Sequence, residues 1–340
     1  MERMNNPYRG AGLPDGAGLA HVPVPSVTLP PAGILAPLNP EAGETPLVTV
    51  EGVGSAGTVW VKDERGRMGL GSFKALGAAY VIACHARDGK AEGRTYVTAS
   101  AGNHGLSVAA GAAAFGAQAV VYLSAAVPEG FAARLRATGA QVVRVEGSYE
   151  DSMDAAGKAA VDKGWTLLSD SSWDGYFDLP HRLMEGYLTL AAEAVAQCPD
   201  VPTHIFLQAG VGGMAASAAA LFRKAWGDAP CIIVVEPEAA PALFESVRAG
   251  RCVETSGPVS EMGRLDCKVP SLIALKGLAR DADMFVTLSE AEARDALPVL
   301  AGKGLATTAS GGAGLAAMLC MTELSGDARG LAIVSEEAEA

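Results

Sequence analysis

The sequence has few of the features that mark metal-binding, nucleic-acid-binding and membrane proteins. Among 340 residues there are six cysteines and five histidines, with no Cys-x-x-Cys pair and no histidines at ligand spacing, so no metal site is expected. Basic residues are in the minority, 26 against 38 acidic ones, and the formal net charge of -12 argues against nucleic acid or an anionic membrane as a partner. No apolar run is long and uninterrupted enough to span a bilayer, and no apolar segment follows a basic start as in a secretory signal.

The composition that is present fits a globular protein with a sizeable core. Apolar residues make up 49% of the chain, and 340 residues allow two domains. Cysteines that are scattered singly are typical of a reducing compartment, so we expect the protein in the cytoplasm. An acidic chain can still bind an anionic cofactor, because a local cluster of backbone N–H groups is positive whatever the net charge.

Apolar residues alternate between strand-like runs and helix-like stretches along most of the chain. This alternation predicts an α/β fold in which helices cover both faces of parallel sheets. Residues 1–44 are rich in Pro and Gly, and we expect them to form a loosely structured arm over the body or a partner subunit. The expected strands are 58–62, 95–97, 119–123, 141–145, 165–168, 205–208, 231–236, 285–288 and 331–334. The expected helices are 72–85, 106–115, 129–137, 149–163, 182–197, 214–226, 241–249, 289–302 and 314–324.

Lys74 lies where a glycine-bearing loop enters one of these helices. The stretch 62–77 reads Lys-Asp-Glu-Arg-Gly-Arg-Met-Gly-Leu-Gly-Ser-Phe-Lys-Ala-Leu-Gly. A lysine at such a place can be held still, partly desolvated, and neutral often enough to condense with an aldehyde. Taken alone, the position fits a solvated surface lysine better.

Three further segments place glycines and small polar residues at the start of helices. Residues 98–105 read Thr-Ala-Ser-Ala-Gly-Asn-His-Gly, residues 205–214 run from an apolar strand into Gly-Val-Gly-Gly, and residues 310–314 read Ser-Gly-Gly-Ala-Gly. Backbone N–H groups at a helix N-terminus suit a carboxylate or a phosphate, and glycines let the backbone approach it closely. Each segment alone also fits an ordinary turn or helix cap, and Gly-x-Gly-Gly also resembles an incomplete dinucleotide loop.

Together and in this order, the four motifs resemble the pyridoxal-phosphate enzymes of the tryptophan-synthase-β type, also called fold type II. The resemblance runs from about Thr45 to about Val334. It implies that Lys74 bonds covalently to the cofactor, that Asn103 contacts the cofactor's phenolic oxygen, and that Ser310 meets the pyridine nitrogen. The phosphate cradle that the resemblance implies consists of Gly210, Val211, Gly212 and Gly213. The substrate-binding residues that it implies are Ser100, Ala101, Gly102 and His104.

Within that superfamily the chain is most similar to the diaminopropionate ammonia-lyase family. The supporting pieces are Lys62-Asp63-Glu64, Asp170-Ser-Ser-Trp-Asp-Gly-Tyr and Arg264-Leu-Asp-Cys. Asp170 matches a second acid of the family and would act near the leaving group, although a turn or helix cap fits it equally well. One departure concerns the residue before Gly-Asn-His-Gly, which in the family is typically an aspartate that handles the proton of the D-substrate. Here it is Ala101, which cannot accept a proton, so the loop reads like that of serine/threonine dehydratases.

The resemblance also implies a domain organisation. Two parallel-sheet, three-layer domains are expected, with pyridoxal 5'-phosphate in the cleft between them. Residues 1–81 together with 169–340 would form the large domain, and residues 82–168 a small mobile domain. A homodimer is expected on the same basis.

The expected reaction is a β-elimination that releases ammonia from a small amino acid. The first candidate substrate is 2,3-diaminopropionate, with pyruvate and ammonia as products. A hydroxyl at Ser310, unlike a carboxylate, would not keep the pyridine nitrogen protonated, which favours prompt loss of a β-substituent. The alternatives are a serine, threonine or 3-hydroxyaspartate dehydratase, a pyridoxal-phosphate-binding protein without turnover, and a nicotinamide-dependent oxidoreductase suggested by the glycine turn alone.

Overall fold

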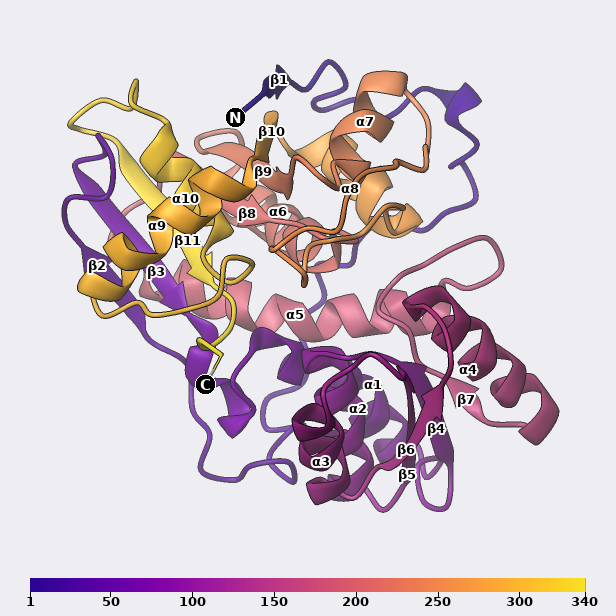
Figure 1. The fold of residues 1–340 in the computed structure, drawn as a ribbon. Coiled ribbons are helices and arrows are strands. Elements are labelled where there is room, and N and C mark those ends of the chain that lie inside the picture. The colour runs from indigo at the N-terminus through magenta and orange to yellow at the C-terminus, as the bar shows by residue number, and fades with distance from the viewer. Residues whose placement is uncertain (340) are drawn as a thin grey trace.

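A computed structural model of the protein describes residues 1–339, and two β-sheets organise them (Figure 1). The larger sheet has seven strands in the order β1-β10-β9-β8-β11-β3-β2. Its inner neighbours pair in parallel, whereas the edge strands β1 and β2 pair antiparallel to β10 and β3. In sheet order, its strands are β1 (Arg3–Asn5), β10 (Met284–Leu288), β9 (Cys231–Pro237), β8 (His204–Gln208), β11 (Arg329–Val334), β3 (Thr58–Asp63) and β2 (Leu47–Val50).

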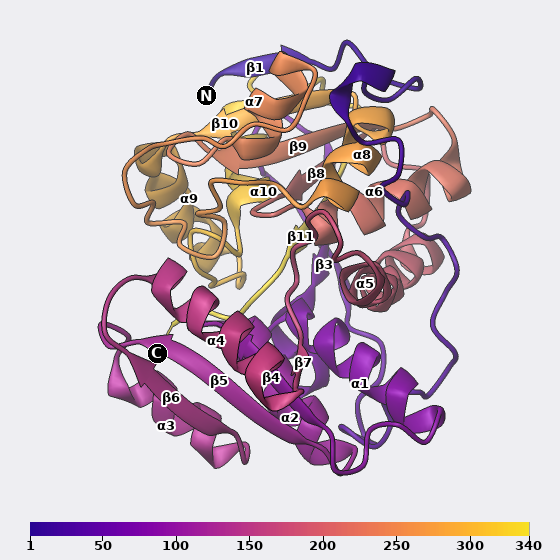
Figure 2. The same cartoon turned by 90° about the vertical axis from the view of Figure 1, so that its right-hand side faces the viewer.

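The smaller sheet has four parallel strands in the order β6-β5-β4-β7. Its strands are β6 (Gln141–Val145), β5 (Gln118–Ser124), β4 (Thr95–Ala99) and β7 (Thr166–Leu167). Figure 2 shows this sheet below the larger one, with the N-terminus beside the larger sheet and the C-terminus beside the smaller one. The predicted domain boundaries at residues 81/82 and 168/169 stay a prediction.

Helices cover both faces of each sheet, as the apolar runs require. The central strands of the larger sheet are buried along their length, which a strand can be only when both of its faces are covered. On one face α6 packs against α5 and α8, and on the other α10 packs against α9 and the strands. In the smaller sheet α2 and α4 each pack against β4 and β5. The helices are α1 (Ala78–Arg87), α2 (Asn103–Ala114), α3 (Glu129–Ala137), α4 (Tyr149–Lys163), α5 (Asp178–Gln197), α6 (Gly213–Trp226), α7 (Ala242–Ala249), α8 (Leu272–Asp281), α9 (Glu290–Gly302) and α10 (Ala313–Cys320).

Most expected elements are present, and α9 begins with a capping box in which Ser289 and Glu292 bond to each other's backbone N–H groups. The helix expected at 72–85 is wrong, because a 3-10 turn, η3 (Phe73–Leu76), precedes α1 and Gly77 separates them. The arm is more ordered than expected, since β1 pairs with β10.

Two further helices differ from the prediction. Helix α8 was not expected. Its N-cap residue Ser271 does not cap the helix with its side chain, because the Ser271 hydroxyl is hydrogen-bonded to the Ser172 hydroxyl at 2.7 Å. The usual capping signal at a helix start is therefore missing here. Helix α10 ends at Cys320, short of the expected residue 324, because Leu324 is buried after the chain has turned.

Two glycines let the Lys74 segment approach helix α5, which lies between the two sheets in Figure 1. A Cβ at Gly186 would lie 2.1 Å from the Leu76 carbonyl oxygen, and one at Gly77 would lie 2.7 Å from the Tyr187 ring. Neither position can therefore carry a side chain without moving backbone or a packed ring. This close contact fixes η3 against α5.

A buried ionic cluster fixes the stretch that leads to Lys74. The Arg67 guanidinium, 2% exposed, pairs with Glu64 at 2.7 Å and with Glu193 of α5 at 2.6 Å. Lys62 of β3 pairs with the same Glu193 at 2.6 Å. Burial lowers the pKa of Lys62, whereas for Arg67 the two carboxylates outweigh burial and raise the pKa. Because buried charges are tolerated only when paired, the cluster defines one arrangement of β3, the following turn and α5.

Candidate active site

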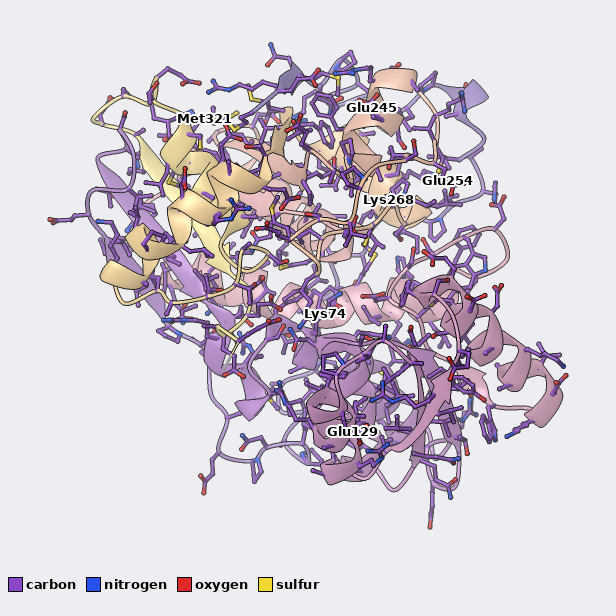
Figure 3. The ribbon with its side chains drawn as sticks, viewed as in Figure 1. Lys74, Glu129, Glu245, Glu254, Lys268 and Met321 are labelled. Carbon is purple, nitrogen blue, oxygen red and sulfur yellow. The ribbon has the colours of Figure 1, made fainter. Side chains whose placement is uncertain are left out.

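The turn before Lys74 positions this lysine. The Ser72 hydroxyl accepts a hydrogen bond from the Lys74 N–H at 3.3 Å, which caps η3. The Phe73 N–H donates to the Ser335 carbonyl at 3.1 Å, so the turn is bound to the end of β11. Figure 3 shows Lys74 where the two sheet bodies meet, one being the larger sheet with its helices and the other the smaller sheet with its helices.

The ammonium group of Lys74 forms an ion pair with Asp170. Its Nζ atom donates to Oδ2 of Asp170 and lies 5.3 and 6.0 Å from the ring centroids of Phe73 and Tyr187. The side chains of Lys74 and Asp170 are 22% and 24% exposed. Burial disfavours both charges, but their mutual attraction outweighs it, raising the pKa of Lys74 and lowering the pKa of Asp170.

This ion pair corrects one expectation from the sequence. Partial desolvation alone would make Lys74 neutral, whereas the carboxylate of Asp170 keeps it protonated in this structure. Asp170 also caps no described helix, since α5 begins at Asp178. Its loop is held by Tyr176, whose hydroxyl donates to the Leu167 carbonyl at 2.8 Å and accepts from the Ser169 N–H at 3.1 Å.

The segment 100–104 follows β4 and enters α2. Its first hydroxyl, on Ser100, accepts hydrogen bonds from the N–H groups of Gly102 and Gly105 at 3.3 and 3.1 Å. Gly102 lies beside the side chain of Arg264, which is 3.4 Å from an ideal Cβ position there. Ala101 is partly buried against the core. The helix begins at Asn103, earlier than expected, so its first N–H groups, which have no intrahelical acceptor, lie within the segment predicted to bind substrate.

His104 is a buried acceptor. Its Nε2 lies 2.9 Å from the Leu168 carbonyl, and because a carbonyl only accepts, the proton is on Nε2 and Nδ1 carries a lone pair. Nδ1 has no hydrogen-bond partner among residues 1–339. Burial lowers the pKa of His104, so the imidazole is neutral near pH 7. His104 thus supplies a neutral acceptor close to the ion pair.

Asn103 bonds to a residue that sequence reasoning did not select. Its Nδ2 donates to Oε2 of Glu336 at 2.5 Å. Glu336 is 5% exposed and follows β11, so this contact joins the two sheet bodies. The sequence signal that could have identified Glu336 is its position just after a parallel strand, because ligands bind at the carboxyl ends of such strands.

The glycine turn 210–213 connects β8 to α6. Gly212 has φ +94°, and a Cβ at Gly210 would lie 3.0 Å from the Arg264 carbonyl oxygen. The carbonyl of Val211 accepts from the Ser271 N–H at 3.0 Å, which holds the turn. Gly213 starts α6, whose first N–H groups have no intrahelical acceptor and suit an anion.

Ser310 is buried, and its hydroxyl accepts a hydrogen bond from the Arg264 N–H at 3.1 Å. Arg264 in turn lies 3.7 Å from Glu336, so Ser310 joins the site through these two residues. The structure therefore pairs Lys74 directly with Asp170, and connects Asn103 to Ser310 only indirectly.

Tyr187 is a second residue that sequence reasoning missed. Its hydroxyl is buried and has no hydrogen-bond partner in the described part of the chain. Its ring lies between Lys74 and Gly213, 3.7 Å from a Cβ placed on this glycine. Burial raises its pKa, so the phenol is neutral. Tyr187 is one of several buried residues of α5, and nothing in the sequence distinguishes it from an ordinary core residue or indicates its position near Lys74.

The residues present fit pyridoxal phosphate. A lysine lies beside unpartnered polar atoms of His104 and Tyr187, and a glycine turn at a helix N-terminus offers N–H groups for a phosphate. Burial raises the pKa of the nearby Cys267 to about 12, so this cysteine is a thiol and does not compete as a nucleophile. Residues 1–339 contain no group of three or more His, Cys, Asp or Glu side chains placed to hold a metal ion.

The chain is similar to known pyridoxal-phosphate enzymes and ammonia-lyases. A family model described as "Pyridoxal-phosphate dependent enzyme" matches residues 38–336. The chain is 33% identical over 283 residues to the diaminopropionate ammonia-lyase of Salmonella typhimurium, covering 75% of this chain and 68% of that protein. It is 29% identical over 259 residues to an L-threonine ammonia-lyase of Geobacter sulfurreducens, covering 75% and 62%.

A solved structure is similar over nearly the whole chain. It is the diaminopropionate ammonia-lyase of Escherichia coli in complex with an aminoacrylate-PLP azomethine reaction intermediate, with a TM-score of 0.85 and 26% identity. The match covers 99% of this chain and 93% of that chain.

The chain therefore belongs to the pyridoxal-phosphate dependent enzymes, and its fold is fold type II. Within that family its relatives make it an ammonia-lyase, a carbon–nitrogen lyase whose cofactor is pyridoxal phosphate. The chain spans about two thirds of the length of the curated diaminopropionate ammonia-lyases that it matches. No helix within residues 1–339 is long and apolar enough to cross a membrane.

Proposed function

We propose that the protein converts L-2,3-diaminopropionate to pyruvate and two molecules of ammonia. The observation that carries this proposal is the ion pair between Lys74 and Asp170. It is an example, within the structure itself, of a carboxylate binding a primary ammonium group. When the nitrogen of Lys74 is bonded to the cofactor, Asp170 is free to accept a second ammonium group.

The charge of Asp170 favours an ammonium over a hydroxyl as the leaving group. The positive charge of Lys74 lowers the pKa of Asp170 against the effect of burial, so the carboxylate is ionised while a cation lies beside it. The second ammonium group of the substrate would take the place of that cation once Lys74 is bonded to the cofactor. An ionised carboxylate cannot give a proton to a hydroxyl, whereas an ammonium group already carries the proton with which it leaves. Diaminopropionate has such an ammonium group on Cβ.

The other residues act on the α-carbon and the carboxylate of the substrate. Pyridoxal phosphate, when bound, supplies an electron sink for the electrons of the broken Cα–H bond. The substrate's α-amino group would take the place of Lys74 on the cofactor, and the lysine released as a neutral amine would remove the α-proton. The N–H groups at the start of α2, with Ser100 and His104, would bind the carboxylate. The glycine turn 210–213 would hold the phosphate, Asn103 would contact the phenolic oxygen, and Ser310 would meet the pyridine nitrogen. Ammonia leaves Cβ, and water then hydrolyses the released enamine to pyruvate and ammonia.

A serine, threonine or 3-hydroxyaspartate dehydratase is the second candidate, because Ala101 stands where the diaminopropionate lyases typically have an aspartate. The deciding assay is keto-acid release from each amino acid by the purified enzyme loaded with cofactor. Pyruvate from L-diaminopropionate at a higher kcat/KM than from L-serine supports the proposal. Pyruvate from serine, with none from either diaminopropionate isomer, overturns it.

We further propose a homodimer in a reducing, cytoplasmic compartment, with residues 82–168 as a mobile domain. The six cysteines are free in the structure, which supports a reducing compartment. The four-stranded sheet lies wholly within residues 82–168, which supports that domain. The dimer rests on the resemblance to the family and is tested by the mass of the particle in solution.

A further inference from the structure

Glu336 is a buried carboxylate at the site to which no role has been given above. Its Oε2 accepts from Nδ2 of Asn103 at 2.5 Å and lies 3.7 Å from Nε of Arg264. Its Oε1 accepts from the Thr308 hydroxyl. Its backbone carbonyl accepts from the Thr307 hydroxyl at 2.5 Å. A side chain held at both carboxylate oxygens and at its own backbone has one orientation.

The contact fixes the orientation of the Asn103 amide. A carboxylate can only accept, so the NH₂ side of the amide must face Glu336 and the carbonyl side must face away. An amide group can otherwise turn over, which would exchange a donor for an acceptor at the same place. Asn103 is the first residue of α2, and its preceding cap residue is Gly102, which has no side chain to hold it. One Nδ2 hydrogen is used by Glu336, and the second is available to another acceptor.

We propose that Glu336 is a positioning residue that holds Asn103 with its amide donor toward the phenolic oxygen of pyridoxal phosphate. This inference rests on the proposed role of Asn103 in cofactor binding. It also assigns a coupling role, because Glu336 follows β11 of the larger sheet and Asn103 starts α2 on the smaller one. A change in the relative position of the two sheet bodies would break this bond and release the amide.

The test is the affinity of the apoprotein for pyridoxal phosphate, measured by fluorescence titration without substrate. Glu336→Gln keeps the shape of the side chain but allows the facing group to be either a donor or an acceptor. We expect about tenfold weaker cofactor binding. Glu337→Gln is the matched control, because it makes the same change at the next residue, whose side chain is 58% exposed, and its affinity is expected to be unchanged.

The same substitution made in a chain that carries Asn103→Ala tells whether Glu336 acts by positioning Asn103 or by supporting the fold in general. If Glu336 acts through Asn103, Glu336→Gln weakens cofactor binding by less than about twofold in a chain that already carries Asn103→Ala. The visible absorption band of the bound cofactor shifts in Glu336→Gln and does not shift further in the double variant. Wild-type affinity in Glu336→Gln, or an equal loss in both backgrounds, overturns the proposal. Because no substrate is present, a wrong substrate assignment leaves this result unaffected.

Discussion

Lys74 and Asp170, 96 residues apart in the chain, share a hydrogen-bonded ion pair at the junction of the two sheet bodies. The pair has two consequences for an enzyme that must bond Lys74 to an aldehyde. Before cofactor binding the pair keeps the lysine protonated. Once Lys74 is bonded to the cofactor, Asp170 is left without its cation and stays ionised only beside another one, such as an ammonium group of the substrate. The following predictions begin with this pair.

Removal of the charge at residue 170 should speed cofactor loading and slow turnover. In Asp170→Asn, the carboxylate no longer offsets burial and the pKa of Lys74 falls, so more of the lysine is neutral at pH 7 and bonds faster to pyridoxal phosphate. Turnover of L-diaminopropionate should fall about 100-fold, because the leaving ammonium loses its partner. Stopped-flow absorbance of apoprotein mixed with cofactor, followed by steady-state assays, measures both rates. Loading that is slower in the variant would contradict this account of the pair.

Residue 101, which precedes Gly-Asn-His-Gly, should decide which isomer of diaminopropionate the enzyme accepts. Ala101 cannot accept a proton, so the loop offers no base for the α-proton of the D-isomer. The wild type should therefore release pyruvate from L-diaminopropionate and little from the D-isomer. Ala101→Asp should raise the rate with the D-isomer about 100-fold, a typical contribution of a general base. Ala101→Asn is the matched control, since it has nearly the same shape and cannot accept a proton. Equal rates for the two variants with the D-isomer would show that residue 101 does not set the stereochemistry.

The buried ionic cluster should be costly to break. Arg67→Met leaves the buried carboxylate of Glu64 without its cation and Glu193 with Lys62 alone, so the free energy of unfolding should fall by about 3–5 kcal/mol in urea denaturation. Arg65→Gln removes a guanidinium that pairs with Asp63 at 2.6 Å but is 24% exposed, and it should cost at most about 1 kcal/mol. Similar losses in the two variants would mean that the cluster does not fix the turn before Lys74.

Glu236 should make stability depend on pH. This carboxyl is 1% exposed, accepts from the N–H groups of Leu243 and Phe244 at 2.8 and 2.7 Å, and its pKa is raised by burial to about 8. A raised carboxyl pKa stabilises the fold below the unfolded value of 4.5 and loses that contribution as the pH rises toward 8. Its share of the unfolding free energy should fall by about 1.4 kcal/mol per pH unit in that window.

The variant Glu236→Gln isolates this effect, because its amide does not titrate. The difference in unfolding free energy between wild type and variant should change across pH 5–8. As the pH rises, the unfolding free energy of the wild type should fall relative to that of the variant. A difference that is constant across this range would mean that Glu236 is already ionised at pH 5.

The elements and the cofactor motifs could be predicted because their signals are local. Lys74, the segment 100–104 and the glycine turn 210–213 each combine a strand end, a turn and a helix start within a few residues. The family that these motifs suggested is confirmed by the family model and by the relatives. Helices such as α3 and α4 begin and end where their periodicity predicted.

The charges and partners inside the site could not be predicted, because they depend on contacts between distant residues. Asn103 meets Glu336 across 233 residues, and neither residue carries a local sign of the other. The protonation of Lys74 could not be predicted from desolvation alone, since its counter-ion Asp170 lies on another segment. The need for glycine at residue 77 likewise depends on a distant contact, because a Cβ there would lie 2.7 Å from the ring of Tyr187 on α5.

The central claim is that Lys74 bonds covalently to pyridoxal phosphate. The most direct measurement is borohydride reduction of the cofactor-loaded enzyme, followed by proteolysis and mass spectrometry of the peptides. The account predicts that the reduced cofactor is attached to the peptide containing Lys74, and that Lys74→Ala yields no such adduct. An unmodified Lys74 peptide in wild-type enzyme, with the cofactor recovered on another lysine or free, would contradict it.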